Sequence, residues 1–143
     1  MKIVALQRLI KVTTKNIAEE VRNKVKLEKQ SHSLVRSIQS IESFMKKEAE
    51  ILSDNPNSYY DYYQFYSYHK DRINKLSTEV KKINQLINDK IETIHNLFIE
   101  KKRYQFLVEK YLAEEKKRLE KDEMQNIDEI NIAKYRRKNY QDS

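Results

Sequence analysis

The sequence contains no glycine and only one proline, Pro56, and this combination limits its fold more than any other feature. A compact domain needs several tight turns, and tight turns need residues that tolerate positive φ, above all glycine. One cluster of turn-forming residues stands out, Ser53-Asp54-Asn55-Pro56-Asn57-Ser58. Its short polar side chains bond readily to nearby backbone groups. We therefore expect a single bend at residues 53–58, with a long helix on either side.

Two capping arrangements are open at the start of the second helix. Asn55 is one candidate N-cap, with Pro56 at the first helical position, where its missing N–H has no cost. Ser58 is the other, with Asp61 three residues later in a weaker form of the capping box. Both place the end of the first helix near Leu52 and the start of the second within a few residues.

Apolar residues recur every seven positions before this bend, as in the a and d positions of a left-handed coiled coil. The pattern keeps one phase over about seven heptads, which favours a coiled coil over a globular bundle. One row consists of Ile3, Ile10, Ile17, Lys24, Ser31, Ile38, Met45 and Leu52, and its companion of Leu6, Thr13, Glu20, Leu27, Leu34, Ile41 and Glu48.

The second arm repeats the scheme, and its rows extend back into a tyrosine-rich segment beside the bend. Beyond Leu112 the apolar pattern fades into charged residues. Two oppositely charged pairs occur there at a spacing of four residues, Glu114 with Arg118 and Lys116 with Glu120. Each such pair stabilises a helix by a few tenths of a kcal/mol. The rows are Ile73, Val80, Ile87 and Ile94; Leu76, Ile83, Lys90, Leu97, Tyr104 and Tyr111; and, towards the bend, Tyr59, Tyr62, Tyr66 and His69.

The lengths of the two arms differ. We expect one domain, residues 1–143, with helices over about 3–52 and 59–138, spanning about 75 Å and about 120 Å. Folding at Pro56 sets Ile3 opposite Glu109, so about 25 residues of the second helix extend beyond the first. The prediction is an all-α fold, a long antiparallel two-helix coiled-coil hairpin with a C-terminal helical overhang.

Charge is unevenly distributed along this hairpin. The net charge is +5 over residues 1–52, −1 over 53–100 and +3 over 101–143, for a total of +7. The hairpin therefore collects basic charge at its terminal end, which suits nucleic acid, anionic lipid or an acidic protein. Carboxylates interleave through residues 109–129 and weaken a phosphate-tracking stripe. An acidic protein is the favoured partner.

The segment 59–68 holds six tyrosines and Phe65, and all of these cannot face one partner helix. For Tyr60, Tyr63 and Tyr68 we favour a protein-binding surface, because exposed aromatic residues mark interfaces. A plug that closes the hairpin tip is an equal alternative for the other three, Tyr59, Tyr62 and Tyr66. Stacking on single-stranded nucleic acid is disfavoured, because no basic residue lies between Lys47 and Lys70.

No catalytic site is expected. The three histidines, His32, His69 and His95, are scattered, and a chain without glycine has no glycine-rich phosphate loop. A two-helix rod offers no enclosed pocket that would exclude water, so we expect a non-enzyme without cofactor or metal. The absence of cysteine, of an 18-residue apolar run and of a signal-peptide pattern predicts a soluble intracellular protein.

Several short stretches together resemble the FliJ family, the soluble stalk of the flagellar type III export apparatus, and its injectisome counterparts. Leu6–Val12 is similar to the opening segment of the family, and Tyr62–Lys82 to the aromatic start of its second helix. The sequences 109–112, Glu-Lys-Tyr-Leu, and 127–129, Ile-Asp-Glu, resemble two later motifs. The family's early Arg-x-x-x-Glu corresponds here to Lys15–Glu19.

This resemblance implies a fold similar to the shaft of rotary ATPase γ subunits, with no cofactor. It implies a cytoplasmic protein, peripheral to the inner membrane, that links a hexameric export ATPase to the cytoplasmic domain of the membrane export gate. It also implies contact with export chaperones and promotion of ATPase assembly. The hypothetical ATPase-binding residues are Lys116, Lys117, Arg118, Arg136 and Arg137, and those for the gate or chaperones are Tyr60, Tyr63, Phe65 and Tyr68.

Three alternatives stay open at this point. The first is a coiled-coil chaperone or scaffold unrelated to secretion, and the second is a basic protein that binds nucleic acid or a membrane surface. The third is a homodimer of extended chains in place of a monomeric hairpin. The sequence also leaves open the choice between a flagellar and an injectisome system.

Overall fold

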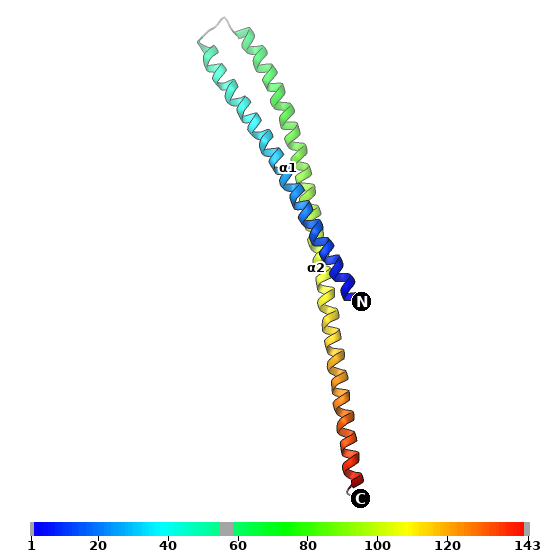
Figure 1. The fold of residues 1–143 in the computed structure, drawn as a ribbon. Coiled ribbons are helices and arrows are strands. Elements are labelled where there is room, and N and C mark those ends of the chain that lie inside the picture. The colour runs from blue at the N-terminus through cyan, green and yellow to red at the C-terminus, as the bar shows by residue number, and fades with distance from the viewer. Residues whose placement is uncertain (1, 55–58, 142–143) are drawn as a thin grey trace. The chain divides into compact units, whose positions relative to one another are not determined.

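The protein is built from two long α-helices. The computed structural model describes residues 2–54 and 59–141 of the 143-residue chain. Helix α1 runs over Lys2–Ser53 and α2 over Tyr59–Gln141 (Figure 1). The described part contains no strand, so the predicted all-α hairpin of two helices is confirmed. The alternative N-caps, Asn55 and Ser58, lie outside the described residues.

Local sequence explains both the length of the helices and the end of α1. Neither helix contains glycine or proline, the two residues that most disfavour a helix interior. In α2, Asp61 lies in the first turn and Lys138 in the last, where their charges complement the helix dipole. At the end of α1 the Ser53 hydroxyl donates to the Glu50 carbonyl at 2.7 Å and thereby satisfies one terminal acceptor.

The chain divides into two units, and each contains a piece of both helices. The hairpin unit is Lys15–Phe98, and the terminal unit comprises Met1–Thr14 and Ile99–Ser143.

The core of the hairpin unit lies in the part of the helix pair nearer the bend. Ile41 and Met45 from α1 pack with Ile73 from α2, and each is buried. Full burial of such a side chain contributes about 1.5–3 kcal/mol. These residues therefore hold the two helices together. The half-buried residues Ile38, Phe65 and Leu76 pack against them.

The predicted seam of the hairpin unit is confirmed with one local difference. Every seam position on α1 from Ile17 to Leu52, and on α2 from Ile73 to Leu97, is buried or half-buried. Near the bend, however, Tyr66 is 41% exposed, whereas its neighbour Phe65 packs against the core. A strict seven-residue count drifts by about 20° per heptad relative to a straight helix, so the buried face does not stay on the counted positions. Near the bend the buried face includes Phe65, on the other edge of the seam from Tyr66.

Two polar contacts connect α1 with α2 within this unit. The Lys90 ammonium donates to a Glu20 carboxylate oxygen at 2.8 Å, and both side chains are largely shielded from solvent. The Ser31 hydroxyl lies 3.1 Å from the amide oxygen of Asn84 and donates to it. The polar seam positions Glu20, Ser31 and Lys90 thus have partners on the opposite helix, whereas Lys24 pairs with Glu28 along α1 at 3.3 Å.

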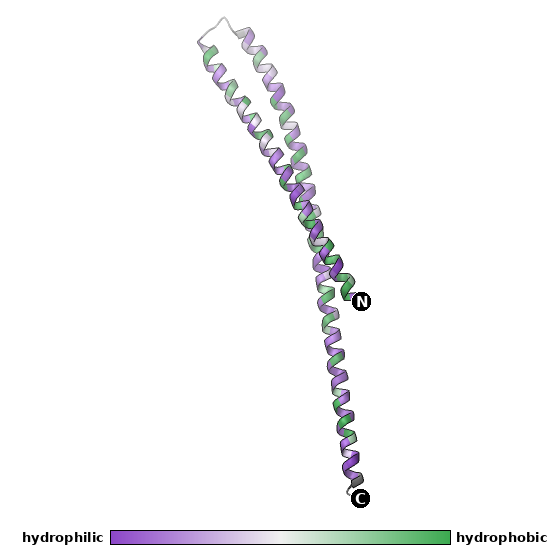
Figure 2. Cartoon of the chain, in the orientation of Figure 1, coloured by the Kyte–Doolittle hydropathy of each residue, from purple (hydrophilic) through white to green (hydrophobic). Residues whose placement is uncertain are grey.

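The terminal unit begins with the same kind of packing. Ile3, Leu6 and Ile10 on α1 are half-buried, as are Tyr104 and Tyr111 on α2. From Leu112 to Asn139 every residue is exposed, so the predicted C-terminal overhang is confirmed. Figure 2 shows mainly hydrophilic residues along this last part of α2, with short hydrophobic segments between them.

Candidate functional site

The overhang, residues 112–139 of α2, carries the basic residues predicted to contact an ATPase. The structure does not gather them into one cluster. Lys117 and Arg136 are 19 positions apart on one continuous helix, which separates them by roughly 28 Å along its axis. The basic charge therefore forms two groups rather than a single patch. All five residues are exposed: Lys116, Lys117, Arg118, Arg136 and Arg137.

Exposed apolar side chains accompany these cations. Leu112 and Leu119 are each about half exposed, and a second apolar group follows towards the end of the helix. Large apolar side chains next to cations are typical of helices that bind another protein. The apolar side chains anchor the helix on its partner, and the charges orient the two proteins. The second group comprises Met124, Ile127, Ile130, Ile132 and Tyr135.

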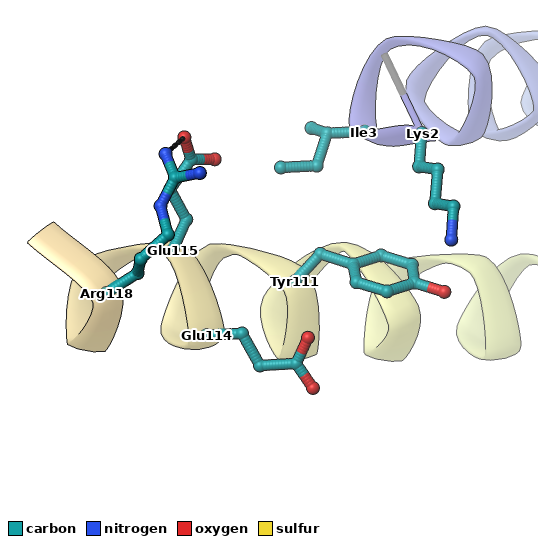
Figure 3. A pocket seen from close by; sticks show the side chains of 6 residues that line it. All are labelled: Lys2, Ile3, Tyr111, Glu114, Glu115 and Arg118. Atoms are coloured by element: carbon teal, nitrogen blue, oxygen red, sulfur yellow. Dashed lines mark ion pairs between the residues drawn. The ribbon is translucent and has the colours of Figure 1, made fainter.

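The ion pairing in the overhang differs from the prediction. Arg118 pairs with Glu115 at 3.5 Å, three residues away, instead of with Glu114. Figure 3 shows the Arg118 guanidinium beside the Glu115 carboxylate, with Glu114 pointing elsewhere. Three- and four-residue spacings both bring side chains together on a helix, so the two geometries compete. Glu115 partly neutralises Arg118.

A shallow groove of about 390 Å³ lies where α1 begins beside α2 (Figure 3). Lys2 and Ile3 line it from α1, and Tyr111 lines it from α2. The Lys2 ammonium lies 5.7 Å from the centre of the Tyr111 ring, within the range of a cation–π interaction. This contact was not predicted from the sequence, because it depends on which residue of α2 faces Lys2.

The predicted tyrosine surface is present in the hairpin unit. Tyr60, Tyr63 and Tyr68 are 72%, 70% and 65% exposed. Phe65, grouped with them from the sequence, lies instead against the core, with its ring centre 5.5 Å from that of Phe44. The exposed aromatic residues of this segment are therefore tyrosines, and Phe65 belongs to the packing between the helices.

His69 joins the aromatic residues near the bend. Its ring centre lies 4.3 Å from that of Phe65, 5.1 Å from that of Tyr68 and 5.9 Å from that of Phe44. Its Nδ1 is enclosed and has no hydrogen-bond partner among the described residues. The sequence predicted His69 as a surface or seam residue, and its half-buried ring lies at the seam.

One ionisable group in the terminal unit has a shifted pKa. The Tyr104 hydroxyl donates to a Glu100 carboxylate oxygen at 2.5 Å. This hydrogen bond, together with the negative charge of Glu100, raises the pKa of Tyr104 above its ordinary value of 10.0. Glu100 thereby favours the neutral phenol at this point of α2.

The residues that the structure describes contain no group of three or more His, Cys, Asp or Glu side chains placed to hold a metal ion. Neither described helix has an apolar stretch long enough to cross a membrane.

Comparison with known proteins gives one match. No curated protein and no solved structure matches the chain. The family described as "Flagellar FliJ protein" matches residues 2–140, which is nearly the whole chain. This match confirms the resemblance seen in the short sequence stretches and extends it to nearly the whole chain. The two helices of the structure confirm the predicted coiled-coil fold. The chain belongs to the FliJ family, whose members are non-catalytic components of flagellar protein export.

Proposed function

We propose that this protein is the stalk of a flagellar export apparatus, linking the hexameric export ATPase to the membrane export gate at the cytoplasmic face of the inner membrane. The observation that carries the proposal is the overhang. Residues 112–139 form continuous helix, and every one of them is exposed. Most of the stability of a helix in a protein comes from packing of its apolar face. A long exposed helix with apolar and basic side chains therefore suits a binding partner.

The overhang is the proposed ATPase contact. Lys116, Lys117 and Arg118 lie between the exposed Leu112 and Leu119. The leucines supply apolar anchors, and the cations meet acidic groups of the ring and steer association. Arg136 and Arg137 form a second contact further along the helix. Binding at both groups favours assembly of the hexamer, because a ligand that binds only the assembled ring stabilises it.

The tyrosine surface is the proposed contact with the export gate and its chaperones. Tyr60, Tyr63 and Tyr68 present large amphipathic rings that are enriched at protein interfaces. This surface belongs to the hairpin unit, whereas the overhang belongs to the terminal unit. Two different partners can therefore be served by separate parts of one chain.

The ATPase contact is tested by binding of the purified export ATPase hexamer to the full-length chain and to a chain lacking residues 115–143. The triple change Lys116→Gln, Lys117→Gln and Arg118→Gln isolates the charge contribution, and we expect it to weaken binding by about tenfold or more. The matched control, Arg22→Gln, Lys26→Gln and Lys29→Gln, removes three exposed cations from α1 and leaves binding unchanged. Undiminished binding of the truncated chain would refute the ATPase assignment.

The gate contact is tested separately. Tyr60→Ser, Tyr63→Ser and Tyr68→Ser together are expected to abolish binding to the cytoplasmic domain of the gate or to export chaperones, while ATPase binding persists. Tyr135→Ser is the control, because Tyr135 is equally exposed but lies on the overhang. If the triple variant binds the gate and the chaperones normally, this surface has another role. Capture of unfolded clients without dependence on the ATPase would instead favour a general coiled-coil chaperone.

A further inference from the structure

A groove of about 540 Å³ between α1 and α2 in the hairpin unit has a donor-rich lining that the stalk role leaves unused. Its lining includes two arginines and three serines but no carboxylate. The groove lies beside the core residue Ile41 and the aromatic ring of Phe44. The question is which ligand such a lining would hold.

Helical spacing explains why these side chains converge. On α1, Ser33, Arg36 and Ser40 follow at intervals of three and four residues and so share one face. On α2, His69 and Arg72 are three apart and face the same groove. Pairing of α1 with α2 then brings one guanidinium group from each helix to the same groove.

Neither arginine has a carboxylate partner among the residues that the structure describes. None of the ion pairs in the described part of the chain includes Arg36 or Arg72. The positions three and four residues away from each, in both directions, hold no acidic residue. Two unneutralised guanidinium groups lining one groove repel each other, and an anion between them relieves that repulsion.

The groove offers more hydrogen-bond donors than a single carboxylate group can accept from. Each guanidinium offers a fork of N–H donors, and the hydroxyls of Ser33 and Ser40 add further donors from α1. A carboxylate has two oxygens, whereas the terminal phosphate of a monoester has three and pairs with arginine in the same bidentate manner.

The apolar part of the lining indicates what the phosphate is attached to. Phe44 is 48% exposed and lines both this groove and a second one, of about 520 Å³. The second groove adds Ser43 and Lys47 to the shared Arg36, again without a carboxylate. An organic body attached to the phosphate would pack on the exposed ring.

We propose that this groove binds the phosphate group of a phosphate monoester, with Arg36 and Arg72 as its principal ligands and Phe44 as the platform for the organic body. The monoester is either a free molecule or the headgroup of a phospholipid. The site is independent of the stalk role, because it uses neither the overhang nor the exposed tyrosines.

The test uses the full-length chain and calorimetric titration with phenyl phosphate, which joins a phosphate monoester to an aromatic ring. Phenylacetate provides the same ring on a carboxylate. We expect phenyl phosphate to bind, phenylacetate to bind at least tenfold more weakly, and Arg36→Gln and Arg72→Gln each to weaken phenyl phosphate binding by about tenfold. Arg22→Gln is the matched control, an exposed arginine of α1 outside the groove, and it changes the affinity less than twofold. Circular dichroism establishes that each variant remains helical.

Vesicle flotation identifies the source of the phosphate. Binding to phosphatidylcholine vesicles that contain phosphatidic acid, lost in Arg36→Gln and Arg72→Gln, supports the proposal and assigns a lipid. Binding of phenyl phosphate without vesicle binding supports it and assigns a free ester. The proposal is overturned if phenyl phosphate does not bind, if phenylacetate binds equally well, or if Arg22→Gln is as damaging as Arg36→Gln.

Discussion

The core of the hairpin unit and the overhang contain the same residue types in opposite environments. Ile73 is 7% exposed in the core, whereas Ile130 is 54% exposed on the overhang. Glu20 and Lys90 form an ion pair between two helices, whereas Glu115 and Arg118 form one along a single helix. Apolar and charged side chains therefore stabilise the fold in one region and remain available to a partner in the other. Three predictions are ordered here from the largest expected effect to the smallest, and the first two test this contrast.

The first prediction compares two isoleucines. Ile41→Ala removes buried methyl and methylene groups from the core and is expected to lower the free energy of unfolding by about 2–4 kcal/mol. Ile130→Ala on the overhang is expected to change it by no more than about 0.5 kcal/mol. Urea unfolding followed by circular dichroism measures both. Equal effects would mean that the overhang is packed against something in solution.

The second prediction compares the two ion pairs in double-mutant cycles, with alanine at each position. The coupling energy between Glu20 and Lys90 is expected to be about 1 kcal/mol, because both side chains are partly shielded from water. The exposed Glu115–Arg118 pair is expected to give about 0.2–0.5 kcal/mol. Added salt should reduce the second coupling more than the first. A larger coupling on the overhang would contradict the contrast.

The third prediction concerns Tyr104 in the terminal unit. Since its folded pKa lies above the ordinary value, the contribution of its hydrogen bond to stability is complete below pH 10 and is lost as the pH rises through the folded pKa. Glu100→Gln removes the negative charge and is expected to lower the Tyr104 pKa towards its ordinary value. Ultraviolet titration of a variant with the other tyrosines changed to phenylalanine measures it. An unchanged pKa would show that Glu100 is not its cause.

The sequence predicted the helices and the seam because both follow from local periodicity. The missing glycine, the single Pro56 and the heptad rows were sufficient for two long helices and for the overhang. The resemblance grouped Phe65 with Tyr60, Tyr63 and Tyr68 as a contact for the gate or chaperones, whereas the structure packs it against the core. The actual rotation of α2 near the bend depends on packing against Phe44 of α1, which no count along one helix includes.

The candidate sites were predictable only in part. Exposure of Tyr60 and Tyr63 followed from the crowding of tyrosines in one segment. The groove beside Phe44 could not be found from the sequence, because Arg36 and Arg72 come from different helices and meet only when the alignment of α1 with α2 is known. Composition therefore predicts surfaces within one helix better than sites shared by two.

The Glu20–Lys90 contact has a consequence for misfolding. Heptad seams are repetitive, so two helices can slide past each other by seven residues and still bury apolar side chains. Such a slip would set Lys90 against Thr13 or Leu27 in place of Glu20 and leave the cation without its carboxylate. Losing the partner of a partly buried charge is costly, whereas the apolar contacts would be largely restored. This pair therefore penalises hairpins in which the two helices are displaced by one heptad.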